Sequence, residues 1–327
     1  MRRMTRRHFI AAAAAFSVAL SLSAQAAGYP ERPVTLVVAF TPGGPSDVLA
    51  RIVGKKMGEI LGSTFVIENK PGAGGNIAAE SVARAKPDGY TLLMGNNSIV
   101  ATNESLYEHL SYSPEKDFLP ITLIGTQANI LVVNPSVPAR SLKELIELCK
   151  GEPGKINFAS SGYGAAAHLA GELFKAKAEV NIVHVAYKGA APALQDVIAG
   201  NEQMMFATAA SVVGHIRSGQ LRALAVTTLK RTAILPDIPT MDEAGLPGFE
   251  ASTWHGLVVP TGTPQGIVAT LHDTAVKALH DTQVQASLQT LGVDIVADTP
   301  QEFASYIRSE IPKWKAIVKA SGASISH

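Results

Sequence analysis

The sequence predicts an α/β fold with two similar lobes. Short apolar segments alternate with amphipathic segments along most of the chain, a pattern typical of layered sheets and helices. The alternating segments form two successive series, and each contains a strand, a Gly-rich loop and a helix in immediate succession. We therefore expect two largely parallel sheets, each flanked by helices.

The two series account for most of the predicted elements. In the first we expect strands at 34–39, 64–68 and 90–94 and helices at 46–61 and 76–85. The second begins after Asn134 and contains helices at 141–150, 165–176 and 190–199, strands at 156–159, 182–186, 203–208 and 221–227, and a short helix between the last two strands. Further helices are predicted at 266–280, 284–291 and 300–320.

The lobe boundaries are predicted from two short apolar runs at 130–134 and 256–260. We interpret both as strands that cross between the lobes. The first lobe is then discontinuous and consists of 27–127 and 256–327, whereas the second consists of 128–255. The final helices are expected to pack back on the first lobe.

The chain begins with what we interpret as an export signal at 1–26. It has four arginines within its first seven residues, an apolar run at 9–22 and small residues before the mature chain. This run is shorter than the about 20 apolar residues that span a membrane. Arg6 and Arg7 resemble a twin-arginine signal, with an ordinary secretory leader as the alternative. We expect a periplasmic protein.

Charge and cysteine content exclude several classes of partner. Without the leader, the chain has 24 of its 28 basic residues and all 27 acidic ones, which gives a net charge of −3. Such a balance predicts binding neither to nucleic acid nor to an anionic membrane. Cys149 is the only cysteine, so the chain forms no internal disulfide and no cysteine metal cluster. We expect no metal site.

Motif searches also argue against an enzyme with a bound nucleotide. Residues 162–167 fit G-x-G-x-x-A, but the next predicted strand ends in Tyr187-Lys188 instead of the acidic residue that binds ribose. The loop PGAGGN at 71–76 has Ile77 where a third small residue is needed, so we interpret it as a plain turn. No G-x-S-x-G elbow or H-E-x-x-H pair occurs. We expect no cofactor.

Two Gly-rich loops are the candidate binding elements. The segment VVAFTPGGPSDVLAR at 37–51 and the segment INFASSGYGAAAHLAGELF at 156–174 each run from a strand through a small-residue loop into a helix. A helix start presents unpaired N–H groups and a partial positive charge. Ligands of open α/β sheets bind beyond the carboxyl ends of the strands, where both loops are expected. We predict that both loops bind one small anion.

These motifs carry a family resemblance. F-x-P-G-G-x-x-D at 40–47, "ENKPGAGGNIAAE", "KPDGYTLL", "NFASSGYGAAAHLAGELF", "VAYKGAAPALQDVIAGN", "LRALAVTT" and "LPDIPTMDEAGLPGFE" resemble the Bug-type substrate-binding proteins of tripartite tricarboxylate transporters. The resemblance covers nearly all of the mature chain. It implies a two-lobed, flytrap-like periplasmic binding protein of type II. It also implies membrane transporter subunits as partners and no catalysis, and we expect a monomer. A periplasmic sensor and an α/β enzyme are the alternative functions.

The resemblance implies that one ligand carboxylate is bound by N–H groups, hydroxyls and water at the two loops. Carried onto this chain, the residues are Phe40, Thr41, Pro42, Gly43, Gly44 and Ser46 in the first loop and Ser160, Ser161, Gly162, Gly164, Ala165 and His168 in the second. Asp47 is expected to hold the first loop or to cap the helix without touching the ligand, because an anion there would repel a carboxylate.

The chain departs from the family pattern where the far end of the ligand is expected. Ala165 stands where the family usually has Ser or Thr, and Ala207 stands where it often has Asp. Without that Asp, the site lacks an acceptor for an ammonium group. We therefore expect a plain mono- or dicarboxylate, aromatic acids included, rather than an amino acid. Distal contacts are predicted at Tyr187, Ala207, Thr208 and Trp254, with His255 as an alternative and His184 as structural.

Overall fold

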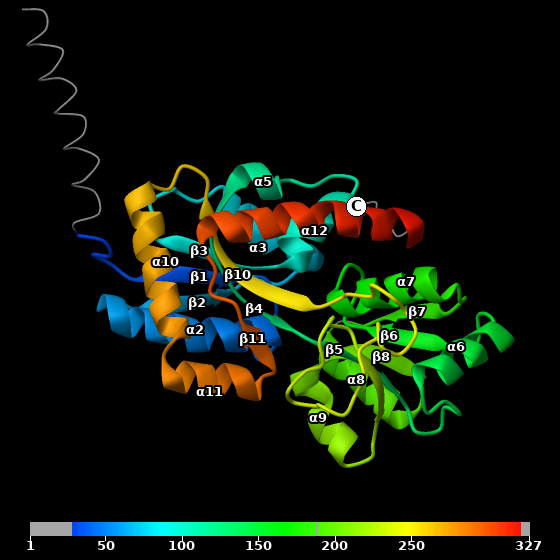
Figure 1. Ribbon diagram of the computed structural model, residues 1–327. Helices are drawn as coiled ribbons and strands as arrows, with labels where there is room; N and C mark the ends of the chain where they lie inside the picture. The colour runs from blue at the N-terminus through cyan, green and yellow to red at the C-terminus, as the bar shows by residue number, and fades with distance from the viewer. Residues whose placement is uncertain (1–27, 188, 322–327) are drawn as a thin grey trace, which may run out of the picture.

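The computed structural model describes residues 28–187 and 189–321. The predicted export signal at 1–26 lies outside these residues. The described chain folds into two α/β lobes, seen side by side in Figure 1, and this confirms the predicted class of fold. No helix in the described ranges is both long enough and apolar enough to span a membrane.

The first lobe contains a sheet of six strands within the described residues. Their spatial order is β11 (Val293–Ile295), β4 (Phe118–Gln127), β10 (Thr253–Pro260), β3 (Thr91–Asn96), β1 (Val34–Val38) and β2 (Phe65–Asn69). Its helical elements are α2 (Pro45–Leu61), η1 (Ala73–Gly75), α3 (Asn76–Ala83), η2 (Ser98–Thr102), α4 (Asn103–Leu106), α5 (Pro114–Asp117), α10 (Gln265–Leu279), α11 (Thr282–Thr290) and α12 (Pro300–Ser321).

The second lobe contains a five-stranded sheet in the described part of the chain. The order is β7 (Val183–Ala186), β6 (Asn157–Ser160), β8 (Met204–Thr208), β5 (Asn129–Val133) and β9 (Arg222–Val226). Its helices are α6 (Leu142–Gly151), α7 (Ala166–Ala178), α8 (Ala190–Ala199) and α9 (Ala209–Arg217). The predicted helices and most strands of both series are therefore confirmed within a few residues.

The sheets are mixed, which corrects the expectation of largely parallel sheets. β1 pairs in parallel with β2 and β3, and β6 pairs in parallel with β7 and β8. In contrast, β10 runs antiparallel to both β3 and β4, and β5 runs antiparallel to both β8 and β9. The strands that the chain enters from the other lobe, β10 and β5, are among the antiparallel ones, and β11 also runs antiparallel to β4.

Successive side chains of a strand point to opposite faces of the sheet, so each sheet packs against a separate hydrophobic core on each face. In β1, Leu36 and Val38 pack in the core under α2 and α10, whereas Val37 packs in the core with α3. In β8, Phe206 packs in the core with α6 and α7, whereas Met205 packs in the core with α8 and α9. Helices therefore cover both faces of each sheet, and the loops at the strand ends are left to form a site.

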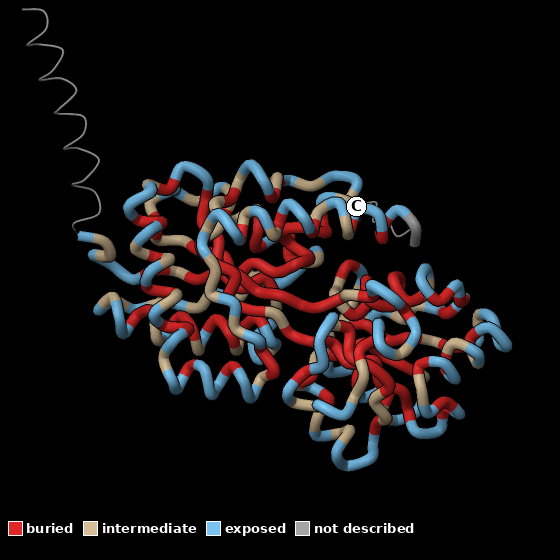
Figure 2. The backbone as a smooth tube through the Cα atoms, viewed as in Figure 1, coloured by how far each residue is buried: buried red, intermediate tan, exposed pale blue. Residues whose placement is uncertain are grey.

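The chain crosses between the sheets twice. One crossing joins β4 to β5, and the other leads into β10, which starts at Thr253. Residues 253–255, expected from the sequence to lie in the second lobe, extend the first sheet because they pair with β4. Figure 2 shows that the crossing segments are buried. We propose that the crossings form the hinge between the lobes.

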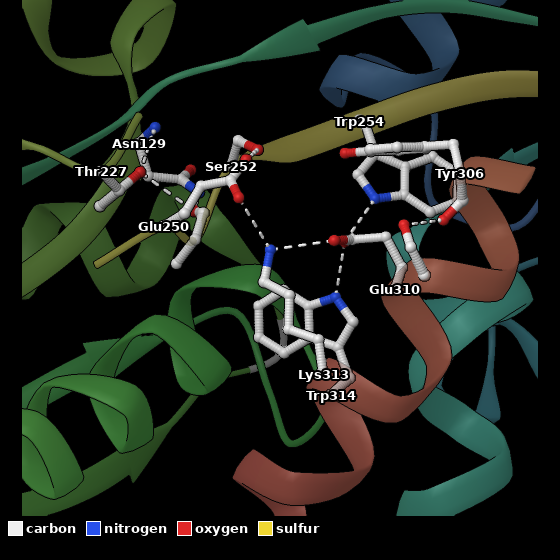
Figure 3. A network of polar contacts seen from close by, with 11 residues as sticks. Asn129, Thr227, Glu250, Ser252, Trp254, Tyr306, Glu310, Lys313 and Trp314 are labelled. Atoms are coloured by element: carbon white, nitrogen blue, oxygen red, sulfur yellow. Dashed lines mark hydrogen bonds and ion pairs between the residues drawn. The ribbon is translucent and has the colours of Figure 1, made fainter. Parts of the chain in front are cut away.

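Helix α12 packs against both lobes, contacting β4 in the first and α7 in the second. Figure 3 shows its buried carboxylate, Glu310, beside the second crossing. Glu310 Oε2 accepts hydrogen bonds from the indole Nε1 of Trp254 at 3.0 Å and of Trp314 at 2.8 Å. Lys313 Nζ donates to Glu310 Oε1 at 2.9 Å and to Glu250 Oε2 at 3.2 Å. The network ties α12 to the segment that enters β10.

Candidate functional site

A cavity of about 830 Å³ lies where the Gly-rich loops of the two lobes meet. The first-lobe wall consists of Ala39, Phe40, Thr41, Gly44, Pro45, Ser46, the loop Pro71, Gly72, Ala73, Gly74, Gly75, and Ser98 and Tyr107. The second-lobe wall consists of Ser161, Gly162, Tyr163, Gly164, Ala165, Gly189 and Ala190. We call this the outer cavity. Its size is typical of a site for a small molecule.

The first loop is held in shape by Asp47. Its Oδ2 accepts a hydrogen bond from the backbone N–H of Gly43 at 2.9 Å, and Asn69 Nδ2 donates to Oδ1 at 2.9 Å. Arg51 donates to both oxygens at 2.9 Å, and this hydrogen bonding lowers the pKa of Asp47 to about 2. The charge of Asp47 is thus paired with Arg51, which reduces its repulsion of an anion in the cavity.

The start of α2 offers free donors to the cavity. Gly44 is the N-cap residue in extended conformation, with φ −76° and ψ 168°, and no side chain caps the helix. The backbone N–H groups of Ser46 and Asp47 lie in the first turn, where an α-helix contains no acceptor for them. Ser46 lines the cavity, so a carboxylate oxygen can take the place of the missing cap.

The second loop is braced by buried side chains beneath it. Ser160 Oγ lies 2.6 Å from His184 Nε2 and accepts a hydrogen bond from the N–H of Gly162 at 3.1 Å. The N–H of Gly164 donates to His168 Nδ1 at 3.1 Å. The rings of His168 and His184 stack with their centroids 4.1 Å apart. These contacts leave Ser161, Gly162, Gly164 and Ala165 at the cavity surface.

A third loop, Pro71–Gly75, completes the wall, which corrects its interpretation as a plain turn. Gly72, Gly74 and Gly75 all have positive φ, and a side chain at Gly74 would clash with Tyr107 Oη. The signal for this loop was present in the sequence. It follows β2, whose carboxyl end lies beside that of the parallel strand β1, so it shares the sheet edge with the first loop.

A smaller cavity of about 140 Å³, the inner cavity, adjoins the outer one through shared wall residues, among them Phe40, Ser46 and Ala165. It reaches the crossing strand β10 at Thr253 and His255. Its other walls are Pro45, Asn96, Asn97, Ser98, Asn129, Ser161, Ala166, Ala167, Ala190, Met205, Phe206, Ala207, Thr208 and Ser211. Its described wall combines apolar and uncharged polar residues.

Helix starts supply the electrostatics of both cavities. Among the described helices, α2, α3, α7, α8 and α9 have an N-cap or first-turn residue in a cavity wall. Each start carries a partial positive charge from the helix dipole. None of the described wall residues is Lys, Arg, Asp or Glu. The site can therefore attract an anion without a basic side chain.

The predicted ligand residues divide into two groups. The first group lines a cavity. Eight of its residues line the outer cavity, namely Phe40, Thr41, Gly44, Ser46, Ser161, Gly162, Gly164 and Ala165. The other two, Ala207 and Thr208, line the inner cavity. Lining neither are Pro42, Gly43, Ser160, His168, Tyr187 and Trp254. Pro42 and Gly43 are exposed at the tip of the first loop, while Ser160 and His168 lie beneath the second.

Tyr187 and Trp254 are turned away from the cavities by contacts that the sequence does not reveal. The hydroxyl of Tyr187 donates to Asp196 Oδ2 at 2.6 Å. Trp254 is fully buried against Phe303 and bonded to Glu310. Because successive residues of a strand face opposite sides, the next residue, His255, reaches the inner cavity instead.

Two buried histidines of the site should make stability depend on pH. Burial lowers the pKa of His168 to about 3 and that of His255 to about 4. In the unfolded chain both would titrate near 6.5. As the pH falls below about 6.5, these histidines therefore become protonated in the unfolded state but not in the folded state, and the free energy of unfolding decreases. Each histidine should remove about 2 kcal/mol between pH 7.5 and pH 5.

This prediction is checked by urea unfolding of the parent and of the variant His255→Gln at both pH values. The parent should lose more stability than the variant, by about the contribution of one histidine. Equal stability of the parent at pH 7.5 and pH 5 would show that these rings bind protons as readily in the folded protein as in the unfolded chain.

The fold is that of periplasmic binding proteins, as comparison with solved structures shows. The periplasmic binding protein BugD matches with a TM-score of 0.82 and 38% identity over 91% of this chain and all of that one. A protein of R. palustris solved with adipate matches with a TM-score of 0.84 and 37% identity, covering 90% and 98%. MatC of Rhodopseudomonas palustris, with bound malate, has a TM-score of 0.82 and 34% identity, covering 89% and 100%.

The family follows from the sequence. The model of the tripartite tricarboxylate transporter family receptor, TctC, matches residues 49–323. The chain belongs to this family of substrate-binding receptors, which confirms the resemblance drawn from the motifs.

Proposed function

We propose that this protein is a periplasmic receptor that binds a small organic carboxylate between its lobes and delivers it to the membrane subunits of a tripartite tricarboxylate transporter. The observation that carries the proposal is the cavity wall, in which several helix starts face one space that lacks charged side chains among the described residues. Such a wall stabilises an anion by oriented N–H groups. Membership of a receptor family supports a binding role, so we propose no catalytic activity.

A site of this kind suits a protein that must also release its ligand. Charge-assisted hydrogen bonds contribute about 1.5–3 kcal/mol each, so a few of them reach the about −8 kcal/mol of micromolar binding. A buried salt bridge would add a larger desolvation cost and a slower release. The adipate and malate bound to the two R. palustris proteins are the ligand chemistry that this wall fits.

The binding test is a thermal-shift screen of mono- and dicarboxylates, aromatic acids and amino acids at equal concentration. A ligand that binds only the folded state raises the melting temperature. Because Ala207 and the other described wall residues provide no carboxylate for an ammonium group, succinate or an aromatic acid should shift the melting temperature more than aspartate or glutamate does. Larger shifts with the amino acids would contradict the ligand class. Delivery is tested by uptake of the labelled acid in cells with and without the receptor gene.

We further propose that the lobes close on the ligand like a flytrap. Contacts already bridge the lobes, since Ser98 Oγ donates to Gly164 O at 3.1 Å and a side chain at Gly164 would meet Leu106. The ligand would add bonds to both loops and favour the closed arrangement. Small-angle scattering should show a smaller radius of gyration with ligand than without. An unchanged radius would argue against closure.

A further inference from the structure

The inner cavity contains buried polar groups that the rest of the protein leaves unpaired. Asn97 is 0% exposed, and neither its Oδ1 nor its Nδ2 has a hydrogen-bond partner among the described residues. His255 is 1% exposed, and its Nδ1 also lacks one. Unpaired buried polar groups are rare in folded proteins because they cost stability. Three such atoms at one small cavity point to a ligand group that pairs with them.

The two residues are brought together at the carboxyl end of β3. His255 pairs with Asn96 in the antiparallel ladder between β10 and β3, and Asn97 is the next residue of the chain. Both line the inner cavity. The two side chains therefore belong to the wall of one small cavity.

The contact between His255 and Ser46 determines which hydrogen the ligand must supply. His255 Nε2 lies 2.8 Å from Ser46 Oγ, and burial lowers the pKa of the ring to about 4, so the ring holds one proton at neutral pH. If the hydroxyl of Ser46 donates to the ligand carboxylate, as the proposed function has it, Ser46 Oγ accepts from Nε2–H. Nδ1 is then a bare acceptor on a residue that lines the inner cavity.

We propose that the inner cavity recognises a hydroxyl group of the ligand, with His255 Nδ1 accepting its hydrogen and Asn97 Nδ2 donating to its oxygen. The ligand is then a hydroxy acid, an assignment that rests on the proposed carboxylate site. A second carboxylate fits this position less well, because an ionised carboxylate has no hydrogen to donate and its lone pairs would repel the lone pair of His255 Nδ1. An ammonium group would be buried without a carboxylate in the described wall.

The test compares acids that differ by one hydroxyl: succinate with malate, propionate with lactate, glutarate with 2-hydroxyglutarate, and benzoate with 4-hydroxybenzoate. Calorimetric titration of the parent should show at least one pair in which the hydroxy acid binds about tenfold more tightly or better, the effect expected for buried polar groups that gain their partner. In Asn97→Leu this advantage should fall below about threefold, with the affinity for the hydroxyl-free acid nearly unchanged. In His255→Leu the advantage should fall likewise, but both acids of a pair should bind more weakly because Ser46 loses its partner.

The matched control is Gln127→Met. Gln127 is 2% exposed and also has an unpaired buried oxygen, but it lies in neither cavity wall. This variant should keep the hydroxyl preference. Binding of acids without any hydroxyl preference, or a preference that survives both Leu variants, overturns the inference and leaves the proposed function intact. Binding of none of the eight acids counts against the proposed function and removes the inference with it.

Two further measurements test the inference without comparing the affinities of different acids. Long-range ¹⁵N–¹H spectra of the parent with a bound hydroxy acid should show His255 protonated at Nε2 and bare at Nδ1. Protonation at Nδ1 would overturn the inference. Asn97→Leu should melt no lower than the parent in the absence of ligand, because it removes an unpaired buried amide. A large loss of stability would show that Asn97 is paired within the protein.

Discussion

The variant Gly44→Asp should fold normally and bind carboxylates at least a hundredfold more weakly than the parent. Gly44 is an N-cap residue with negative φ, and a Cβ atom at this position would meet Thr41 O only at an ordinary 3.5 Å. Asp is a favourable N-cap residue that accepts hydrogen bonds from the N–H groups of the first turn. The new carboxylate would therefore occupy the donors that the ligand needs.

Repulsion adds to this competition. Two like charges 4 Å apart at an effective dielectric of 20 oppose one another by about 4 kcal/mol, roughly a thousandfold in affinity. Calorimetric titration and a thermal melt would measure binding and folding together. Gly44→Asn, which adds the same shape without charge, should lose less affinity. A Gly44→Asp variant that binds within threefold of the parent would remove the first loop from the site.

The fold control for this experiment has to be chosen from the structure. Gly58, near the end of α2, is unsuitable because a Cβ atom there would lie 2.5 Å from Ser63 O. Gly151, at the end of α6, has open space around its Cβ position and lines neither cavity. Gly151→Asp should keep both the melting temperature and the affinity close to those of the parent.

Replacing Glu310 by Ala should destabilise the protein by about 3–5 kcal/mol, the effect of breaking a buried ionic network by removing one partner. Glu310 is 4% exposed and accepts from Trp254, Lys313 and Trp314. Without it, two buried indole N–H groups lose their acceptor, and Lys313 keeps only Glu250. Because the network ties α12 to the second crossing, the loss of Glu310 should destabilise the packing of α12 against both lobes.

Urea unfolding of Glu310→Ala and Glu310→Gln measures this effect. Gln keeps an acceptor for the indoles but removes the charge that Lys313 contacts, so it should lose less stability than Ala. Arg308→Ala, at an exposed position of the same helix, should change stability by no more than about 0.5 kcal/mol. A loss below 1 kcal/mol for Glu310→Ala would show that the network contributes little to stability.

The sequence by itself determined the elements of the fold and the two loops of the site. Hydrophobic periodicity and small residues are local signals, so they predict α2 and α8 within a residue of their observed bounds. The strand, Gly-rich loop and helix start at 37–51 predict an anion site because these backbone features follow from consecutive residues. The family also follows from motifs that lie in order along the chain.

Only the tertiary structure decided which side chains reach the cavities. Periodicity says that Trp254 and His255 face opposite sides of β10, but it does not say which side is the cleft; packing of Trp254 against Phe303 and Glu310 decides this. His168 is turned beneath its own loop, where its ring accepts from the N–H of Gly164 and stacks on His184 of β7. That stacking joins residues of two different elements, so the spacing of residues along the chain does not reveal it.

The same limit applies to strand direction and to the third loop. Whether β10 runs parallel or antiparallel to its neighbours depends on where the chain re-enters the first sheet, a long-range event without a local signal. Pro71–Gly75 has the composition of any turn, and it became a cavity wall only because β2 pairs in parallel with β1 and brings their carboxyl ends to one edge. Local periodicity thus specifies elements, whereas contacts between distant residues specify the chemistry of the site.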